Sequence, residues 1–265
     1  MEKEKNKSSW EPASSWYNKS VGEKGHYYHR NVIIPQLLKL MKNQGFKGPL
    51  LDLACGQGIL SRHIPASVSY TGLDISPSLI KAAKSYQSRE NHTFLVKDIE
   101  QPFLLEKDTF CTATIILAIQ NIKEPYKVFS ELYSCLKTGS SFFIVMNHPY
   151  FRIPRQTSWE VDERKKIQYR RVDAYMSSLT IPIQTHPGLS SSIQTISFHY
   201  PLSAYSKWLK EAGFMIEEIH EWCSDKKSEG AKAKMEDKSR SEFPLFMCLQ
   251  VKKINKSHVI KDSFK

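Results

Sequence analysis

No stretch of the sequence approaches the roughly 20 uninterrupted apolar residues that a membrane-spanning helix needs. The first thirty residues are rich in lysine and aromatic side chains and lack the hydrophobic core of a secretory signal. We therefore expect no membrane span and a cytoplasmic location.

The sequence also lacks any C-x-x-C pair, and its five cysteines are odd in number and widely scattered. They are Cys55, Cys111, Cys135, Cys223 and Cys248. A disulfide framework or a zinc site needs paired or clustered cysteines. The pattern therefore indicates separate buried thiols and no metal site.

Acidic residues are fewer than basic ones, with 27 Asp and Glu against 38 Lys and Arg, which gives a net charge of +11. A basic surface attracts acidic partners. However, the excess is spread over the lysine-rich start and over residues 152–171, 226–240 and 252–265. Because such tails and loops are usually solvated, this distribution disfavours a nucleic-acid partner. At 265 residues the chain can bury one ample core, and we expect one elaborated domain.

A glycine turn follows an apolar strand near the start of the predicted core. Gly56 and Gly58 allow a sharp turn and a close approach of the backbone to a ligand. The third glycine of dinucleotide-binding enzymes is missing, since Ser61 occupies its place, which disfavours a pyrophosphate cradle. Asp74 ends the next strand, near the spacing at which a carboxylate meets ribose hydroxyls. Together these residues favour an adenosine site over a bare strand-to-helix turn.

Apolar strands and amphipathic helices alternate along residues 49–146. We expect strands at 49–54, 69–74, 93–97, 110–118 and 141–146, and helices at 57–64, 77–88 and 124–136. Ser76 and Pro77 supply a cap and a first-turn proline for the second of these helices. This alternation predicts an α/β fold with a doubly wound parallel sheet.

The alternation stops at residues 147–190, which carry prolines and arginines and predict a helical or irregular insertion over the ligand edge. A strand at 193–200 and a helix at 202–211 follow. Strands at 214–221 and 244–251 would close the sheet. Residues 224–241 are hydrophilic and predict a mobile loop between these two strands.

Several motifs resemble those of class I S-adenosylmethionine-dependent methyltransferases, most of all the UbiE-like small-molecule branch with a methyltransferase type 11 domain. The motifs are LDLACGQG at 51–58, TGLDISP at 71–77, VKDI at 96–99, IILAIQN at 115–121 and LKTGSSF at 136–142. One departure is Thr138-Gly139-Ser140, where the family usually has Pro-Gly-Gly. The resemblance covers about residues 20–253. It implies a Rossmann-like, mostly parallel sheet of seven strands that ends in an antiparallel hairpin.

The resemblance also implies S-adenosyl-L-methionine as cofactor and S-adenosyl-L-homocysteine as product. Asp74 would bind the ribose hydroxyls, and Asp98 would bind the adenine amine, although a turn cap is the alternative for Asp98. The remaining residues that it implies at the cofactor are Asp52, Ala54, Cys55, Gly56, Gly58, Ile75, Ile99, Leu117, Ala118 and Gln120.

Two histidines are candidates for a general base, because both follow strands at the expected ligand edge. His148 stands in Asn147-His148-Pro149-Tyr150, which does not match the Asn-Pro-Pro-Tyr motif of amine methylation and follows the wrong strand. His199 is the second candidate. Packing under the insertion is the alternative for both. Positioning alone can supply most of the catalysis in a methyl transfer, so a base is not required.

Guanidinium and aromatic groups mix in the predicted insertion. Arg152, Arg155 and Trp159 would suit a substrate with an anionic or aromatic part. The alternative is a solvated helix face at 164–171. By resemblance, the aromatic segment with Tyr17 and Tyr28 would form a lid over the cofactor, and simple packing onto the first helix is the alternative.

We accordingly predict a tail at 1–15, a lid and first helix at 16–45, the catalytic domain at 46–253 and a basic tail at 254–265. The predicted function is in-line methyl transfer to a small molecule that is aromatic, quinone-like or anionic. The alternatives are a nucleic-acid or protein methyltransferase and a non-catalytic, cofactor-binding interaction module. The sequence leaves the oligomeric state and the methylated atom open.

Overall fold

The computed structural model describes residues 10–87, 89–185 and 194–255. Its helices are α1 (Ser14–Val21), α2 (Ile34–Asn43), α3 (Pro77–Tyr86), α4 (Pro125–Cys135), α5 (Leu202–Ala212) and α6 (Ala233–Glu242). Its strands are β1 (Leu50–Leu53), β2 (Tyr70–Asp74), β3 (His92–Val96), β4 (Phe110–Ile116), β5 (Leu136–Asn147), β6 (Thr157–Asp162), β7 (Ile167–Val172), β8 (Leu179–Gln184), β9 (Gln194–His199), β10 (Phe214–Trp222) and β11 (Phe246–Lys253). None of these helices has the length and apolar content that crossing a membrane requires.

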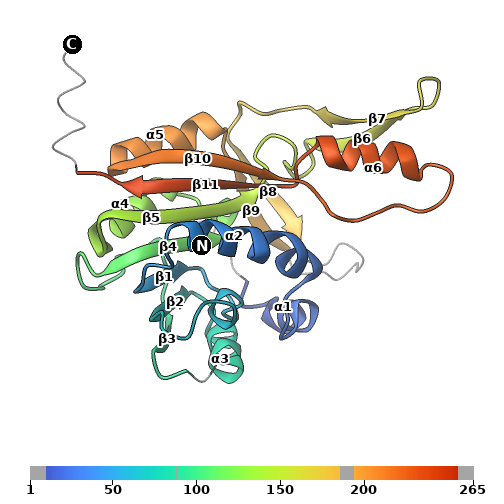
Figure 1. Cartoon of the computed structure of the whole chain (residues 1–265). Helices are drawn as coiled ribbons and strands as arrows, with labels where there is room; N and C mark the ends of the chain where they lie inside the picture. Colours follow the sequence, from blue (N-terminus) through green and yellow to red (C-terminus); the bar gives the residue numbers. More distant parts are fainter. Residues whose placement is uncertain (1–9, 88, 186–193, 256–265) are drawn as a thin grey trace, which may run out of the picture.

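Seven strands form one twisted sheet in the order β10-β11-β5-β4-β1-β2-β3 (Figure 1). Strand β11 pairs antiparallel with both β5 and β10, while the pairs among β1 to β5 are all parallel. The predicted doubly wound sheet and its closing hairpin are therefore confirmed. Strands β2 and β3 lie on one side of β1, and β4 and β5 lie on its other side. The strand order therefore reverses between β1 and β4. Open α/β sheets bind ligands at such a reversal.

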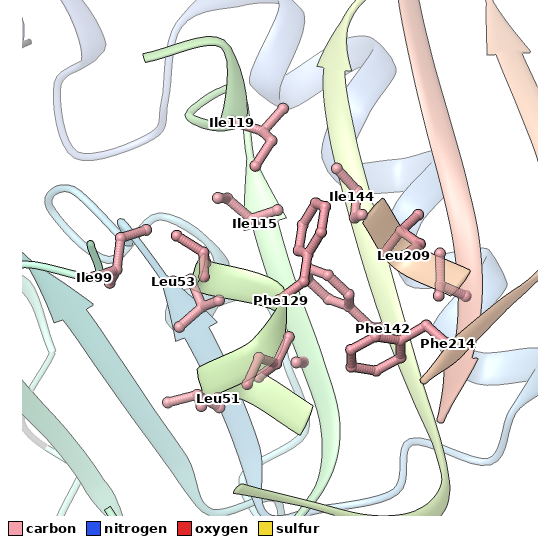
Figure 2. Packing of buried hydrophobic residues seen from close by; sticks show 14 of the residues in the cluster. Leu51, Leu53, Ile99, Ile115, Ile119, Phe129, Phe142, Ile144, Leu209 and Phe214 are labelled. Carbon is pink, nitrogen blue, oxygen red and sulfur yellow. The ribbon is translucent and has the colours of Figure 1, made fainter. Parts of the chain in front are cut away.

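Both faces of the sheet are covered by helices, because the central strands are apolar on both sides. On one face, Phe142 and Ile144 of β5 pack with Phe129 of α4 and Leu209 of α5 (Figure 2). On the other face, Phe143 lies in a core with residues of α2 and α3. The two cores fix the carboxyl ends of β1, β2 and β4 along one rigid edge.

The predicted helix at 57–64 is absent, and turns with a short 3₁₀ turn at Leu60–Arg62 take its place. Gly58 has φ +70°, which an α-helix cannot contain. Pro65 further disfavours helical geometry at Ile64. The connection from β1 to β2 is therefore a compact turn.

The insertion after β5 is built from hairpins, whereas we expected helical or irregular structure. Strand β6 pairs antiparallel with β7, and β8 pairs antiparallel with β9. Residues 164–171 thus belong mainly to a strand and its turn and do not form the helix face weighed above. Exposure alternates along β7 with the period of a strand. Residues 186–190 of the predicted insertion lie outside the described residues.

The expectation of a mobile loop at 224–241 is wrong, since α6 spans Ala233–Glu242 and lies beside β7 (Figure 1). Its Ser239 is buried, and the Ser239 hydroxyl donates to the Gln168 carbonyl at 2.8 Å. Arg240 pairs with Glu236 and Asp237 one turn earlier, each at 3.4 Å. The charged residues that suggested disorder thus stabilise a helix docked on the hairpin.

The predicted tail at 1–15 ends earlier than expected. Trp10 and Glu11 are ordered parts of the fold, and Ala13 is buried just before α1. The remainder of that tail, residues 1–9, lies outside the described residues, as do residues 256–265 of the predicted basic tail.

Asp52 occupies the middle of β1 with its side chain in the interior. Its carboxylate accepts hydrogen bonds from the Tyr70 hydroxyl at 2.6 Å and from the Thr114 hydroxyl at 2.7 Å. Burial is the largest influence on this carboxyl group and raises its pKa to about 6. Asp52 therefore bridges β2 and β4 across β1.

Asp52→Asn should increase stability at neutral pH. The folded state holds a proton on Asp52 up to about pH 6, whereas the unfolded state releases it near 3.8, so stability falls as pH rises through this window. An asparagine does not titrate, so the variant should not lose this part of the free energy of unfolding, which is at most on the order of 3 kcal/mol above pH 6. Urea unfolding from pH 4 to 8 measures it, with exposed Asp173→Asn as control. Parallel stability curves for Asp52→Asn and wild type would contradict the assignment.

Candidate functional site

A cavity of about 320 Å³ opens at the carboxyl ends of β1, β2 and β4. This volume lies at the lower end of the range for small-molecule sites. Nine of the twelve predicted cofactor residues line it: Ala54, Gly56, Asp74, Ile75, Asp98, Ile99, Leu117, Ala118 and Gln120. The structure thus brings three strand ends and the loop after β3 together around one space.

Asp74 ends β2 and anchors the two turns beside the cavity. One carboxylate oxygen accepts from the Gly56 amide at 2.8 Å, and the other accepts from the Ser76 amide at 2.9 Å. Burial raises the pKa of Asp74, and these two amide bonds oppose the shift. Each carboxylate oxygen has a second lone pair. The group can therefore accept from a neighbouring diol while it holds both turns.

Two non-glycine residues at the cavity wall have left-handed backbones. Ala54 follows β1 with φ +51°, and Leu117 follows β4 with φ +53°. The Leu117 amide nevertheless donates to the Val145 carbonyl at 2.7 Å, so the surrounding sheet holds this conformation. Strained backbones of this kind concentrate at ligand sites. Here they turn the chain sharply and leave both strand ends open to the cavity.

Three residues predicted at the cofactor do not line the cavity. The carboxylate of Asp52 is engaged with Tyr70 and Thr114 inside the sheet. Cys55 is buried behind the turn, against Gly72, and burial raises its thiol pKa. Gly58 lies against Phe94. Cys55 and Gly58 pack the turn against β2 and β3, and the structure gives no support for cofactor contact by either. Asp52 was expected to act through the glycine turn, and its place behind that turn leaves this indirect role a prediction.

The N-terminal segment covers the cavity, and Trp10 and Tyr17 line it. The Tyr17 ring lies over Gly56, with its hydroxyl 3.6 Å from where a Cβ would stand. Glu11 fastens the segment to the start of α3, because its carboxylate accepts from the hydroxyls of Ser76 and Ser78. These hydrogen bonds lower the pKa of Glu11. A carboxylate is also favoured at a helix N-terminus.

Sequence reasoning missed His29, which lines the cavity from the π-helix His29–Ile33 that leads into α2. Its Nδ1 atom is buried without a hydrogen-bond partner among the described residues. Burial lowers the pKa of His29 to about 4, so the imidazole is neutral near pH 7. Trp10 Nε1 and Gln120 Oε1 are also buried at the cavity without partners in the described part of the chain. Trp10 precedes the turn that leads into α1, and His29 begins a π-helical stretch that runs into α2, so neither position carries a motif that predicts a ligand contact.

Neither predicted catalytic histidine lines this cavity. His148 has Nε2 at 2.7 Å from the Glu221 carboxylate, and its Nδ1 accepts from the amides of Tyr150 and Phe151 at 3.2 Å. His199 has Nε2 at 2.7 Å from the Tyr175 carbonyl. Burial lowers the pKa of both rings. Both histidines pack the insertion, which was the alternative for each, and their contacts give the general-base hypothesis no support.

The five residues predicted to bind the substrate lie in different parts of the structure. Tyr17 lines the main cavity. Tyr28, Arg152 and Trp159 line a separate pocket under the β6–β7 hairpin. Arg155 is exposed and lines none of the pockets described, so its assignment to a substrate has no structural support.

Residues 51–144 match the family described as "Methyltransferase domain". Over these residues the chain is similar to a methyltransferase domain. The match runs from β1 into β5 and confirms the family predicted from the motifs.

Curated relatives extend the similarity modestly. The chain is 30% identical to the "Ubiquinone biosynthesis O-methyltransferase" of Coxiella burnetii over 138 residues, 49% of this chain and 56% of that protein. It is 34% identical to the "Ubiquinone/menaquinone biosynthesis C-methyltransferase UbiE" of Geotalea daltonii over 109 residues, 37% of this chain and 45% of that protein. The chain thus spans about half the length of these relatives.

A solved structure of an S-adenosylmethionine dependent methyltransferase from Mesorhizobium loti superposes with a TM-score of 0.60. The two share 22% identity, and the alignment covers 77% of this chain and 89% of that one. At this identity the likeness concerns the fold, and it confirms the predicted class I architecture of the methyltransferase domain.

Gly58→Ala should destabilise the fold through the turn that borders the cavity. A Cβ at this position would lie 2.7 Å from Phe94 Cε1, and the φ of +70° disfavours any side chain. Gly45→Ala is the matched control, because Gly45 has φ +79° and open space around it. The control should lose about 1–2 kcal/mol, and Gly58→Ala about 1–3 kcal/mol more. If urea unfolding shows the same loss of stability for both variants, the Phe94 ring can move aside for the new methyl group at no energetic cost.

Proposed function

We propose that the protein transfers a methyl group from S-adenosylmethionine to a small-molecule acceptor bound in the main cavity. The observation that carries this proposal is the Asp74 carboxylate, which faces the cavity between two fixed turns with lone pairs left for a diol. The predicted cofactor agrees with the domain family and with the name of the Mesorhizobium structure.

The residues present fit an S-adenosyl group. Asp74 would accept from the ribose hydroxyls, and Asp98 and Ile99 would lie beside the adenine. The amide backbone at Ala54 and Gly56 would face the methionine part. When bound, the sulfonium supplies an electrophilic methyl group. The protein's contribution is to hold the acceptor in line with that group and to exclude water under Trp10 and Tyr17.

The acceptor side of the cavity offers three polar atoms without partners among the described residues. They are Trp10 Nε1, His29 Nδ1 and Gln120 Oε1. A neutral imidazole can accept a hydrogen bond from a phenol or enol. The two curated relatives are named for ubiquinone or menaquinone biosynthesis, which supports an aromatic, quinone-like acceptor. His29 replaces His148 and His199 as the group placed to meet it.

Methylation of a nucleic acid or a protein is the alternative that the net charge of +11 favours. A cavity covered by an N-terminal segment suits a small molecule better than a polymer. Binding through phosphate contacts would weaken steeply with salt, whereas binding inside the cavity would respond little. A non-catalytic role would make the retained Asp74 site unnecessary. The cytoplasmic location stays a prediction.

Asp74→Asn tests the cofactor site directly. The amide keeps the size of the side chain but loses the charge and two acceptor positions, so S-adenosylmethionine should bind at least about tenfold more weakly, ~1.4 kcal/mol. Calorimetry on the folded variant measures this, and Asp173→Asn should bind like wild type. If the folded wild type binds neither S-adenosylmethionine nor S-adenosylhomocysteine, the proposed function is wrong.

Glu11→Gln tests whether the N-terminal segment acts as the predicted lid. The change weakens the charged hydrogen bonds to Ser76 and Ser78, so bound S-adenosylmethionine should dissociate up to about tenfold faster. Stopped-flow displacement followed by tryptophan fluorescence gives the rate. Glu23→Gln, on an exposed part of the same segment, is the control. Wild-type dissociation rates in both variants would mean that the segment is fixed packing and does not gate the cavity.

A further inference from the structure

A second pocket, of about 190 Å³, lies between the β6–β7 hairpin, the segment after β5 and the turn before β11. Tyr28, Phe151, Arg152, Trp159, Arg170 and Phe243 line it. The main cavity shares none of these residues. The pocket therefore combines two guanidinium groups with aromatic walls.

Arg152 is largely withdrawn from solvent without a counter-charge. Its guanidinium carbon lies 5.5 Å from the centre of the Phe246 ring. Within residues 10–87, 89–185 and 194–255, its side chain has no hydrogen bond or ion pair. Burial lowers its pKa. An uncompensated charge in such surroundings is costly, and an anion would relieve that cost.

Arg170 brings a second cation to the same pocket. It donates from Nε to the Phe151 carbonyl at 2.8 Å and from Nη2 to the Thr157 hydroxyl at 2.7 Å. Its guanidinium lies 5.2 Å from the Trp159 ring centre. These contacts fix its plane but do not neutralise it. Burial lowers the pKa of Arg170, and the charge of Arg152 lowers it further, so the two cations are close enough to repel each other.

The neighbouring Arg171 shows that acidic partners are available outside the pocket. Its Nε lies 2.7 Å from the Asp173 carboxylate, and its Nη1 lies 4.0 Å from Glu160. Among the residues that the structure describes, no acidic one lines the pocket itself. Arg171 thus has carboxylate partners, whereas the described contacts of Arg170 include no carboxylate.

Aromatic rings supply the rest of the pocket surface. Phe243 meets Phe151 edge to face at 5.3 Å and meets Trp159 at 5.4 Å between ring centres. Tyr28 closes another side, and its ring packs 5.5 Å from that of Phe246. Such walls suit a flat apolar body, while a guanidinium fork matches a carboxylate or a phosphate.

The pocket is separate from the main cavity. Between them lies a hollow of about 30 Å³, lined by Arg152 together with Gln120 and Asn147. It has room for about one or two water molecules. A ligand held by Arg152 and Arg170 would therefore not extend into the space beside Asp74.

We propose that Arg152 and Arg170 form a second binding site, which takes a small organic anion with an aromatic body and a carboxylate or phosphate group. This site goes beyond methyl transfer and does not depend on it. Loss of S-adenosylmethionine binding would leave it standing, and its absence would leave the proposed function standing.

Titration of the full chain with benzoate and with phenyl phosphate tests the site, with benzyl alcohol as the neutral control. Fluorescence reports binding because Trp159 lines the pocket, and Trp159→Phe identifies its signal. At least one of the two anions should bind, and the tighter one identifies the preferred acidic group. Benzyl alcohol should bind at least about tenfold more weakly.

Arg152→Gln should weaken anion binding at least about tenfold, ~1.4 kcal/mol. Arg152→Lys keeps the charge without the fork and should lose less. Arg171→Gln is the matched control on the same hairpin and should bind within about twofold of wild type. Thermal unfolding checks that each variant folds. In wild type the anion should raise the unfolding temperature, and in Arg152→Gln it should not.

Three results would overturn this proposal. The first is the absence of binding by both anions up to about 10 mM. The second is benzyl alcohol binding as tightly as benzoate, which would leave an apolar pocket only. The third is unchanged affinity in folded Arg152→Gln and Arg152→Lys.

Discussion

Asp74 accepts hydrogen bonds from the backbone of two turns that belong to different parts of the chain. The Gly56 amide belongs to the turn after β1, and the Ser76 amide begins the approach to α3. A single carboxylate therefore sets the distance between these turns, and that distance defines one wall of the cavity. Because the group is buried, its position is determined by these amide bonds and not by solvent.

Ser76 extends this arrangement to the N-terminal segment. Its hydroxyl accepts from the Leu79 amide as the cap of α3 and also donates to Glu11. The same short stretch thus orders β2, begins a helix and fastens the cover that carries Trp10. Geometry at the cofactor wall and closure of the cavity are in this way physically linked through Asp74, Ser76 and Glu11.

The sheet and most of the cavity wall could be predicted, because they depend on short-range rules. Apolar runs define the strands, and residues at their carboxyl ends, such as Asp74 and Asp98, must meet at one edge. Parts that depend on tertiary contacts could not be predicted in the same way. Asp52 has the right motif position, but partners on β2 and β4 engage its carboxylate. His29 has no sequence signal, since it reaches the cavity only through the packing of α2.

Among the described residues, the strand that completes the sheet is the last along the sequence, yet β11 lies inside the sheet, between β5 and β10. In the pairing of β5 with β11, Val145 lies opposite Cys248, and the whole insertion and α6 separate the two residues in the sequence. During synthesis β5 therefore has an unpaired, apolar edge until the final strand has emerged, and such edges are prone to wrong pairing. Pairings between residues so distant in sequence also form slowly. Folding of this protein should thus be limited by the arrival of β11, and loss of residues 246–253 would expose the interior of the sheet and not merely trim its border.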